Sequence, residues 1–321
     1  MNISREESTY MKALAIIFII LSYILNNCIG EKAVKISALL GTGGVWIFLI
    51  LSGYGLFCSY KEKGLEFKLY WNSKVNNVFG PYVIITIIYY LWLRLSGKNI
   101  GLTVLVKNIL CIDYDRNMDG TMWYMSFLLL WYILFFVVFY FDYSTIFKVT
   151  VLFVCAYIFY NGYYKSIFSE CNWQFVTNAY AFPIGVLLGS WSKHNYQKCK
   201  DLNLCKRLLG CGAMMIYLLG FFDILSFSYG QFGFILFGIT FFLGKVFIKK
   251  MNIINNIVTI IGKNSYILYL VEGKVMSILA IQFLPNSPYV FAIGMIMLTW
   301  FVTYVYNVTK KSRVWRIISE S

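Results

Sequence analysis

The chain has 321 residues, of which 60% are hydrophobic, 20% aromatic and only 13% charged. A soluble globular protein carries about twice that charged fraction, so these values exclude an ordinary soluble domain. The formal net charge of +14 does not indicate nucleic-acid binding, because no basic patch with interleaved aromatic residues occurs in a soluble segment.

The apolar residues are grouped in blocks of about 20, the length that crosses a hydrocarbon layer about 30 Å thick as a helix. Blocks of this length along the whole chain predict an all-α, polytopic integral membrane protein. We interpret residues 1–321 as a single transmembrane domain. In chain order the predicted spans are 11–29, 39–60, 79–95, 122–141, 147–164, 176–192, 208–222, 229–247, 264–283 and 288–307.

The distribution of Lys and Arg predicts how these helices are oriented. If both termini are cytoplasmic, twenty of the 28 basic residues fall in cytoplasmic segments, seven fall in outside segments, and Lys274 lies within a span. Basic residues hold cytoplasmic loops against anionic lipid and resist translocation. We therefore expect about ten transmembrane helices in the cell membrane, with the N- and C-termini cytoplasmic.

Two connecting segments are long enough to have structure of their own. Residues 61–78 alternate charged and aromatic side chains, which predicts an amphipathic helix on the cytoplasmic surface. Residues 98–121 are expected to cap the outer face. Cys111 and Cys171 both fall in predicted outside loops, where a disulfide between them is geometrically possible. The eight cysteines show no spacing typical of a metal site.

Lys12 and Tyr23 are eleven residues apart on the first predicted helix. Eleven residues rise about 16 Å in almost three turns, so both side chains share one helix face, with Lys12 at the cytoplasmic edge and Tyr23 near mid-membrane. A lysine at that edge could hold a phosphate, and the tyrosine would lie at the bottom of a cavity. An interfacial lysine and a packed tyrosine would have the same spacing, so the spacing alone leaves the function open.

The ninth predicted span contains two ionisable residues, Glu272 and Lys274. Charged groups inside a membrane helix usually line a cavity or pair with another group. Residues two apart on a helix point in different directions, so these two need separate partners. A functional role for Glu272 and a simple bond to a polar neighbour both remain open.

The chain has one histidine, His194, which falls in a predicted basic cytoplasmic loop. Without a histidine in the membrane, neither a Ser/His/Asp nor a Cys/His arrangement can be built there. Zinc and haem sites are equally unsupported, and we expect no metal.

Five segments resemble, in the expected order, the acyltransferase type 3 family of bacterial integral membrane proteins. They are Lys12 to Tyr23, Gly43 to Tyr54, Lys74 to Pro81-Tyr82, Met122-Trp-Tyr with Trp131-Tyr132, and Gly262-Lys-Asn-Ser-Tyr-Ile-Leu-Tyr-Leu. The matches span residues 5 to 275, although helix count alone carries the region 145–250. The resemblance implies transfer of an acyl group, commonly acetyl, from cytoplasmic acyl-CoA to a carbohydrate or lipid-linked glycan at the outer face.

The chain departs from the family at the residues that the resemblance implies for the chemistry. Lys12, Lys74 and Asn77 stand at arginine positions, and a lysine keeps the charge but loses the bidentate fork that suits CoA phosphates. Tyr23 stands at the position of the catalytic histidine, and a phenol with its ordinary pKa near 10 is a poor base at pH 7. Two further histidine positions are occupied by Thr121 and Glu272.

Two classes of function follow from this pattern. In a divergent acyltransferase, Glu272 would serve as the base, Tyr23 would orient the acceptor, and Lys12 and Lys74 would hold acyl-CoA. Alternatively, a catalytically inactive relative would keep the cavity to bind or pass a lipid-linked glycan, or would serve as an assembly partner. A transporter agrees with the composition but has no motif of its own. The lipid bilayer is the partner in every case, and the oligomeric state is not predicted.

Overall fold

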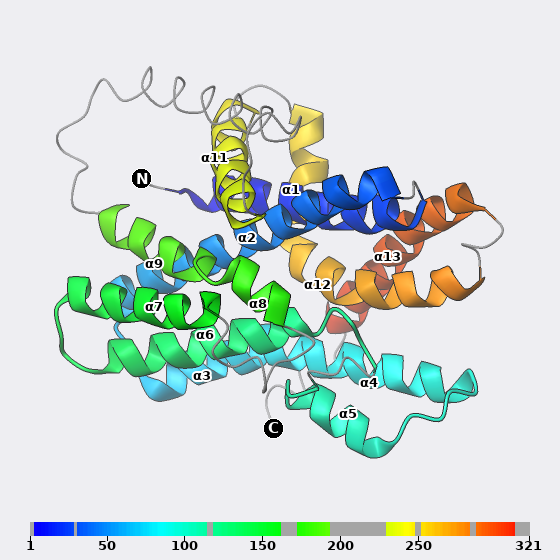
Figure 1. Ribbon diagram of the computed structural model, residues 1–321, viewed down its shortest axis with the longest axis horizontal. Helices are drawn as coiled ribbons and strands as arrows, with labels where there is room; N and C mark the ends of the chain where they lie inside the picture. Colours follow the sequence, from blue (N-terminus) through cyan, green and yellow to red (C-terminus); the bar gives the residue numbers. More distant parts are fainter. Residues whose placement is uncertain are drawn as a thin grey trace.

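The computed structural model describes residues 3–28, 31–113, 118–161, 172–192, 229–247, 252–282 and 287–311. Over these ranges the protein is all-helical, as the composition predicts, and none of them contains a strand. The helices pack side by side in one bundle (Figure 1). They are α1 (Arg5–Cys28), α2 (Glu31–Lys63), α3 (Phe67–Lys74), the π-helical turn η1 (Val75–Phe79), α4 (Gly80–Leu95), α5 (Leu102–Ile109), α6 (Trp123–Tyr140), α7 (Thr145–Tyr160), α8 (Asn172–Asn178), α9 (Ala181–Ser192), α11 (Tyr229–Phe247), α12 (Asn252–Gln282) and α13 (Pro288–Lys311).

Eight of the ten predicted spans correspond to one helix each: α1, α2, α4, α6, α7, α11, α12 and α13. The predicted span 176–192 was wrong as a continuous helix, since α8 ends at Asn178 and α9 begins at Ala181. Pro183 in the first turn of α9 explains the break, because proline has no N–H to continue the hydrogen-bond ladder of a preceding helix. The predicted span 208–222 lies outside the described residues.

Five helical segments of the described chain are long and apolar enough to cross a membrane. They are Arg5–Asn27, Val34–Lys63, Phe67–Leu95, Trp123–Tyr140 and Pro288–Thr309. The third combines α3, η1 and α4 into one segment. Helix α12 has 31 residues but is not among the five, and it carries Lys263, Glu272 and Lys274.

The two connecting segments with expected structure both contain short helices. Helix α3 lies within residues 61–78, where it buries Tyr70 and exposes Phe67 and Leu69. Helix α5 lies within residues 98–121 and buries Leu105. Of the two cysteines between which a disulfide was possible, Cys171 lies outside the described residues, and Cys111 is a buried free thiol.

A reciprocal cap fixes the start of α1. The Glu7 backbone N–H donates to the Ser4 side-chain oxygen at 3.1 Å, and the Ser4 backbone N–H donates to the Glu7 carboxylate at 2.8 Å. This capping box satisfies backbone donors that would otherwise be unpaired at the helix start. It therefore defines where Lys12 lies relative to the beginning of the helix.

Helix α2 lies in the middle of the bundle, in contact with α1, α9 and α11 (Figure 1). Its crossing with α9 depends on two glycines that face the partner helix. A Cβ atom at Gly53 would overlap the carbonyl oxygen of Phe182, and one at Gly185 would overlap that of Ile50. Small residues permit such close backbone approach between membrane helices, where van der Waals packing drives association. Gly53 is thus a packing contact between α2 and α9.

The π-helical turn η1 joins α3 to α4 just before Pro81. The Gly80 N–H donates to the Val75 carbonyl, a bond across five residues instead of four. Proline lacks an N–H and crowds the carbonyl four residues earlier, so a widened turn relieves the conflict without ending the helix. The wider turn brings Asn77 and Val78 to the cavity described below.

We expect Gly53→Ala to destabilise the protein by about 1–3 kcal/mol, because the added methyl group overpacks the α2–α9 crossing. Gly55→Ala is the matched control on the same helix, since a Cβ there meets no atom within 4 Å. It should be neutral or slightly stabilising, given the higher helix propensity of alanine. Thermal unfolding of both variants in detergent checks this. Equal unfolding temperatures would contradict the packing role of Gly53.

Candidate active site

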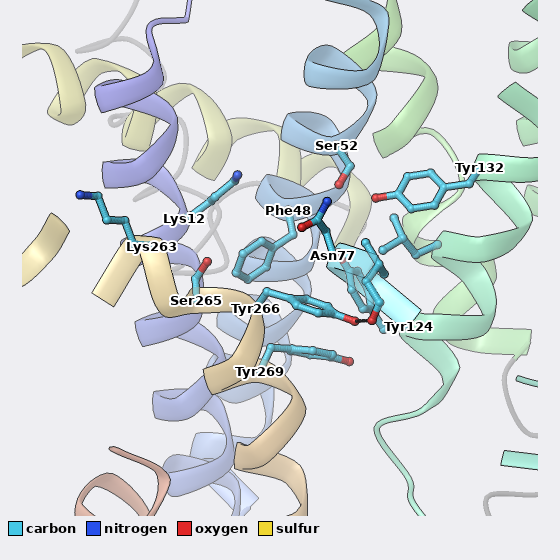
Figure 2. A pocket seen from close by; sticks show the side chains of 13 residues that line it. Lys12, Phe48, Ser52, Asn77, Tyr124, Tyr132, Lys263, Ser265, Tyr266 and Tyr269 are labelled. Carbon is cyan, nitrogen blue, oxygen red and sulfur yellow. Dashed lines mark hydrogen bonds between the residues drawn. The ribbon is translucent and has the colours of Figure 1, made fainter. Parts of the chain in front are cut away.

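A cavity of about 240 Å³ lies between α1, α2, η1, α6 and α12 (Figure 2). Phe48 and Ser52 on α2 are four residues apart, which places them on one helix face. The same spacing separates the three α6 residues, and the α12 residues recur at three- and four-residue intervals. The cavity is lined by Lys12, Phe48, Ser52, Asn77, Val78, Tyr124, Leu128, Tyr132, Gly262, Lys263, Ser265, Tyr266 and Tyr269.

One end of the cavity is cationic. Lys12 from α1 and Lys263 from α12 both line it, and the two helices approach closely there because Gly262 has no side chain. A Cβ at Gly262 would overlap the carbonyl oxygen of Thr9. Lys263 is exposed and Lys12 is half-buried. In Figure 2 the Lys12 side chain points toward the other lining residues, whereas that of Lys263 points away from them.

Lys74 lies against the outside of one cavity wall. Its Nζ is 4.6 Å from the ring centroid of Tyr132, which lines the cavity, and 5.3 Å from that of Tyr70. A cation over an aromatic face is attracted by the negative charge of the ring. The Tyr70 hydroxyl donates to the Tyr132 carbonyl at 2.8 Å, which fixes α3 on α6 and keeps Lys74 in this place.

Tyrosines from α6 and α12 form the rest of the wall. The Tyr266 hydroxyl donates to the Val78 carbonyl at 2.7 Å and so joins α12 to η1 (Figure 2). The rings of Tyr124 and Tyr269 meet edge to face, with their centroids 4.8 Å apart. The Tyr269 hydroxyl donates to the Thr121 carbonyl at 3.0 Å. These contacts hold Tyr269 at the deep end of the cavity.

Glu272 continues the face of α12 that lines the cavity. It follows Ser265 and Tyr269 at helical spacing and lies about 4.5 Å beyond Tyr269 along the helix axis. Its side chain is fully buried, and neither carboxylate oxygen has a hydrogen-bond partner among the described residues. A buried carboxyl without a partner is costly, so such a group is a candidate for binding or catalysis.

Lys274 has the separate partner that its spacing from Glu272 predicts. Its Nζ forms a buried ion pair with Asp119 at 2.6 Å and also donates to the Leu270 carbonyl at 3.0 Å. Asp119 lies in the connection between α5 and α6. Burial alone would raise the pKa of Asp119, but the charge of Lys274 and hydrogen bonds from Lys274 and Thr121 hold that pKa below its usual value.

Tyr23 is half-buried on α1 and is not one of the cavity residues. It interacts electrostatically with Tyr269, as does Glu272. The structure thus brings Lys12 into the cavity and Lys74 against its wall. Of the other two, Glu272 lies one helical turn after Tyr269 on α12, and Tyr23 interacts with Tyr269 from α1.

Sequence reasoning did not single out Ser52, Tyr132 or Tyr269 as site residues, although all three belong to segments that resemble the family. Asp119 falls in residues 98–121, which were expected only to cap the outer face. Its ion pair joins positions 155 residues apart in sequence, and no local pattern signals a contact of that separation.

The model of the acyltransferase domain family matches residues 5–307. The chain belongs to this acyltransferase family. The match covers nearly the whole chain, including the region 145–250 for which the sequence offered only helix count. No curated protein and no solved structure matches the chain significantly. Its several apolar helices and its family make this acyltransferase-domain protein a multi-pass membrane protein.

We expect Lys274→Met to destabilise the protein by about 3–5 kcal/mol, because it leaves the Asp119 carboxylate buried without its counter-ion. The double variant Asp119→Asn/Lys274→Met removes both charges and should recover most of the loss, since neutral groups replace a buried pair at little cost. Thermal unfolding of the single and double variants measures both effects, with exposed Lys107→Met as control. A double variant no more stable than the single one would contradict this view of the pair.

Proposed function

We propose that the protein transfers an acetyl group from acyl-CoA to a hydroxyl of a cell-surface carbohydrate or lipid-linked glycan. The family match supports acyl transfer in general. The observation that carries the proposal is the line of groups on α12. The cavity lined by Lys12 and Lys263 extends to Tyr269, and one turn further on lies Glu272, whose carboxyl has no hydrogen-bond partner in the described part of the chain. A polar donor substrate can enter such a cavity, and a base lies beyond it.

We also propose that the chain crosses the cell membrane with ten helices and has both termini in the cytoplasm. The lysine end of the cavity then faces the cytoplasm. The excess of basic residues in the segments assigned to that side supports this orientation. Lys12 and Lys263 then face the compartment that holds acyl-CoA. The Asp119 end of α12 lies toward the outer face, where the acceptor would approach.

The donor would bind by its phosphates at the lysine end. Lys12 and Lys74 are the two residues that the family pattern suggests for this task. Lys12 lines the cavity, and Lys74 lies against the Tyr132 ring in its wall. An ammonium binds phosphate as a compact charge without bidentate geometry. The thioester end of the donor would extend along Tyr132, Tyr124 and Tyr269 toward the membrane interior.

Glu272 would act as the base in the transfer. It takes the proton of the acceptor hydroxyl, whose oxygen attacks the thioester carbonyl carbon. The C–S bond breaks, the acyl group remains on the acceptor oxygen, and Glu272 passes the proton to the CoA sulfur, which leaves as the free thiol. Tyr23, which like Glu272 is a neighbour of Tyr269, would orient the acceptor. A positioned base of this kind typically contributes about 10²–10⁴-fold to the rate.

A second candidate function is a non-catalytic relative that binds or passes a lipid-linked glycan through the same cavity. The observation that favours it is the sequence itself, since the one histidine of the chain is His194. The two candidates differ in whether acyl-CoA is consumed, so a turnover measurement separates them.

Glu272→Gln should lower the turnover of acyl-CoA by about 10²-fold or more, because the amide cannot accept a proton. The assay follows release of free CoA by purified protein in lipid discs, with water or a crude glycan extract as acceptor. Glu66→Gln, at an exposed carboxylate before α3, is the matched control and should retain activity. Turnover that persists unchanged in both Glu272→Gln and Tyr23→Phe would contradict the catalytic proposal.

Lys12→Met should raise the KM for acyl-CoA by about tenfold or more, since a hydrogen bond to a charged group contributes about 1.5–3 kcal/mol. Lys148→Met is the control, because Lys148 is also buried but contacts Tyr60 and Phe139 away from the cavity. Its KM should stay within about twofold of the wild-type value. An unchanged KM in Lys12→Met would remove Lys12 from the donor site.

A further inference from the structure

One short turn, residues 119–121, holds α12 on both sides of Glu272. Asp119 Oδ2 accepts from Lys274 Nζ at 2.6 Å, two residues after Glu272. The Thr121 carbonyl accepts from the Tyr269 hydroxyl at 3.0 Å, three residues before it. Two hydrogen bonds from the same turn therefore hold residues 269–274 of α12, the stretch that contains Glu272.

Asp119 also fixes the turn itself. Its Oδ1 accepts from the Thr121 backbone N–H at 2.8 Å and from the Thr121 hydroxyl at 2.7 Å. The Thr121 side chain lies so close to Gly273 that a Cβ atom on that glycine would overlap its Cγ2 methyl. Asp119, Thr121 and Lys274 are all buried. The turn thus packs directly on the helix residue that follows Glu272.

These contacts restrict how α12 can rotate or slide. Tyr269, Gly273 and Lys274 are each held by the turn, and their directions around the helix axis differ, so no rotation of α12 satisfies all three except the observed one. Glu272 is carried on the same stretch of helix. The carboxylate of Glu272 has no hydrogen-bond partner among the described residues. The polar bonds that hold this stretch of helix are therefore those of its neighbours Tyr269 and Lys274.

We propose that Asp119 is a positioning residue for acyl transfer, which clamps α12 through Lys274 and Thr121 and so sets the direction of Glu272. The inference rests on the proposed function of Glu272 as the base. Asp119 and Lys274 do not line the cavity, so neither would touch the bound donor. A displacement of about 1 Å at a reacting group can cost about 10²-fold in rate, so loss of the clamp should lower kcat and leave the KM for acyl-CoA unchanged.

The decisive variant is Asp119→Asn/Lys274→Met, in which both charges are absent and the protein is expected to be stable. We expect its kcat to fall about tenfold or more, while its KM for acyl-CoA stays within about twofold of wild type. Lys274→Arg is the matched control, because an arginine keeps the ion pair with Asp119, and its kcat should stay within about threefold. If the pair served stability alone, the double variant would have wild-type kcat, and that result would overturn the inference.

Amide hydrogen exchange of the same variants tests the clamp independently of enzymatic activity. In the double variant, amides of residues 269–276 should exchange faster than in wild type, while amides of residues 8–20 on α1 should exchange at the wild-type rate. Identical exchange of 269–276 in both proteins would refute the clamp. If wild-type protein consumes no acyl-CoA yet the exchange difference is present, the proposed function fails and the clamp on α12 stands.

Discussion

A lysine inside a membrane protein needs a counter-ion or a route to water, and the Lys274–Asp119 pair meets this requirement in a site that is almost fully buried. The pair joins α12 to the connection between α5 and α6. Much of the inner structure depends on this connection, because the same turn receives the Tyr269 hydroxyl and packs on Gly273. The hydrogen bond to Thr121 holds Tyr269 in the cavity wall, between the open space and Glu272.

The cavity changes character along its length in a way that suits acyl transfer. Lysines lie where it meets the surface, tyrosine hydroxyls and rings form its middle, and an unpartnered carboxyl lies past Tyr269. Positive charge attracts phosphates, aromatic walls accommodate a slender apolar arm, and a desolvated carboxyl can accept a proton. The family supplies the class of reaction, and the proposed base is Glu272 because the one histidine of the chain, His194, lies outside the five segments that resemble the family.

Local patterns in the sequence were enough to predict the helices but not their contacts. The apolar block 229–247 coincides with α11, and the run from Ser4 to Glu7 begins α1 as a capping box does. The break between α8 and α9 and the π-helical turn before Pro81 follow from prolines that hydropathy does not weigh. Both are local effects that a closer study of proline spacing would have found.

The candidate site was predictable only in part, for a physical reason. Lys12 was found because helical spacing and the family motif single it out, whereas Tyr23, expected at the bottom of the cavity, is not one of its lining residues. The role of Asp119 was missed because a buried ion pair between distant segments depends on tertiary packing, and an aspartate in a polar loop has the same local signature whether it is solvated or paired. The sequence did predict that Glu272 and Lys274 have separate surroundings, because side chains two residues apart on a helix point in different directions.

The most direct test of the account is a structure of the protein in lipid discs with a non-hydrolysable acetyl-CoA analogue. The account predicts density for the phosphates beside Lys12 and Lys263, with the arm of the analogue between α6 and α12 and its acyl end at Tyr269. An analogue that binds elsewhere on the protein would contradict it, as would a cavity that stays empty at saturating concentration.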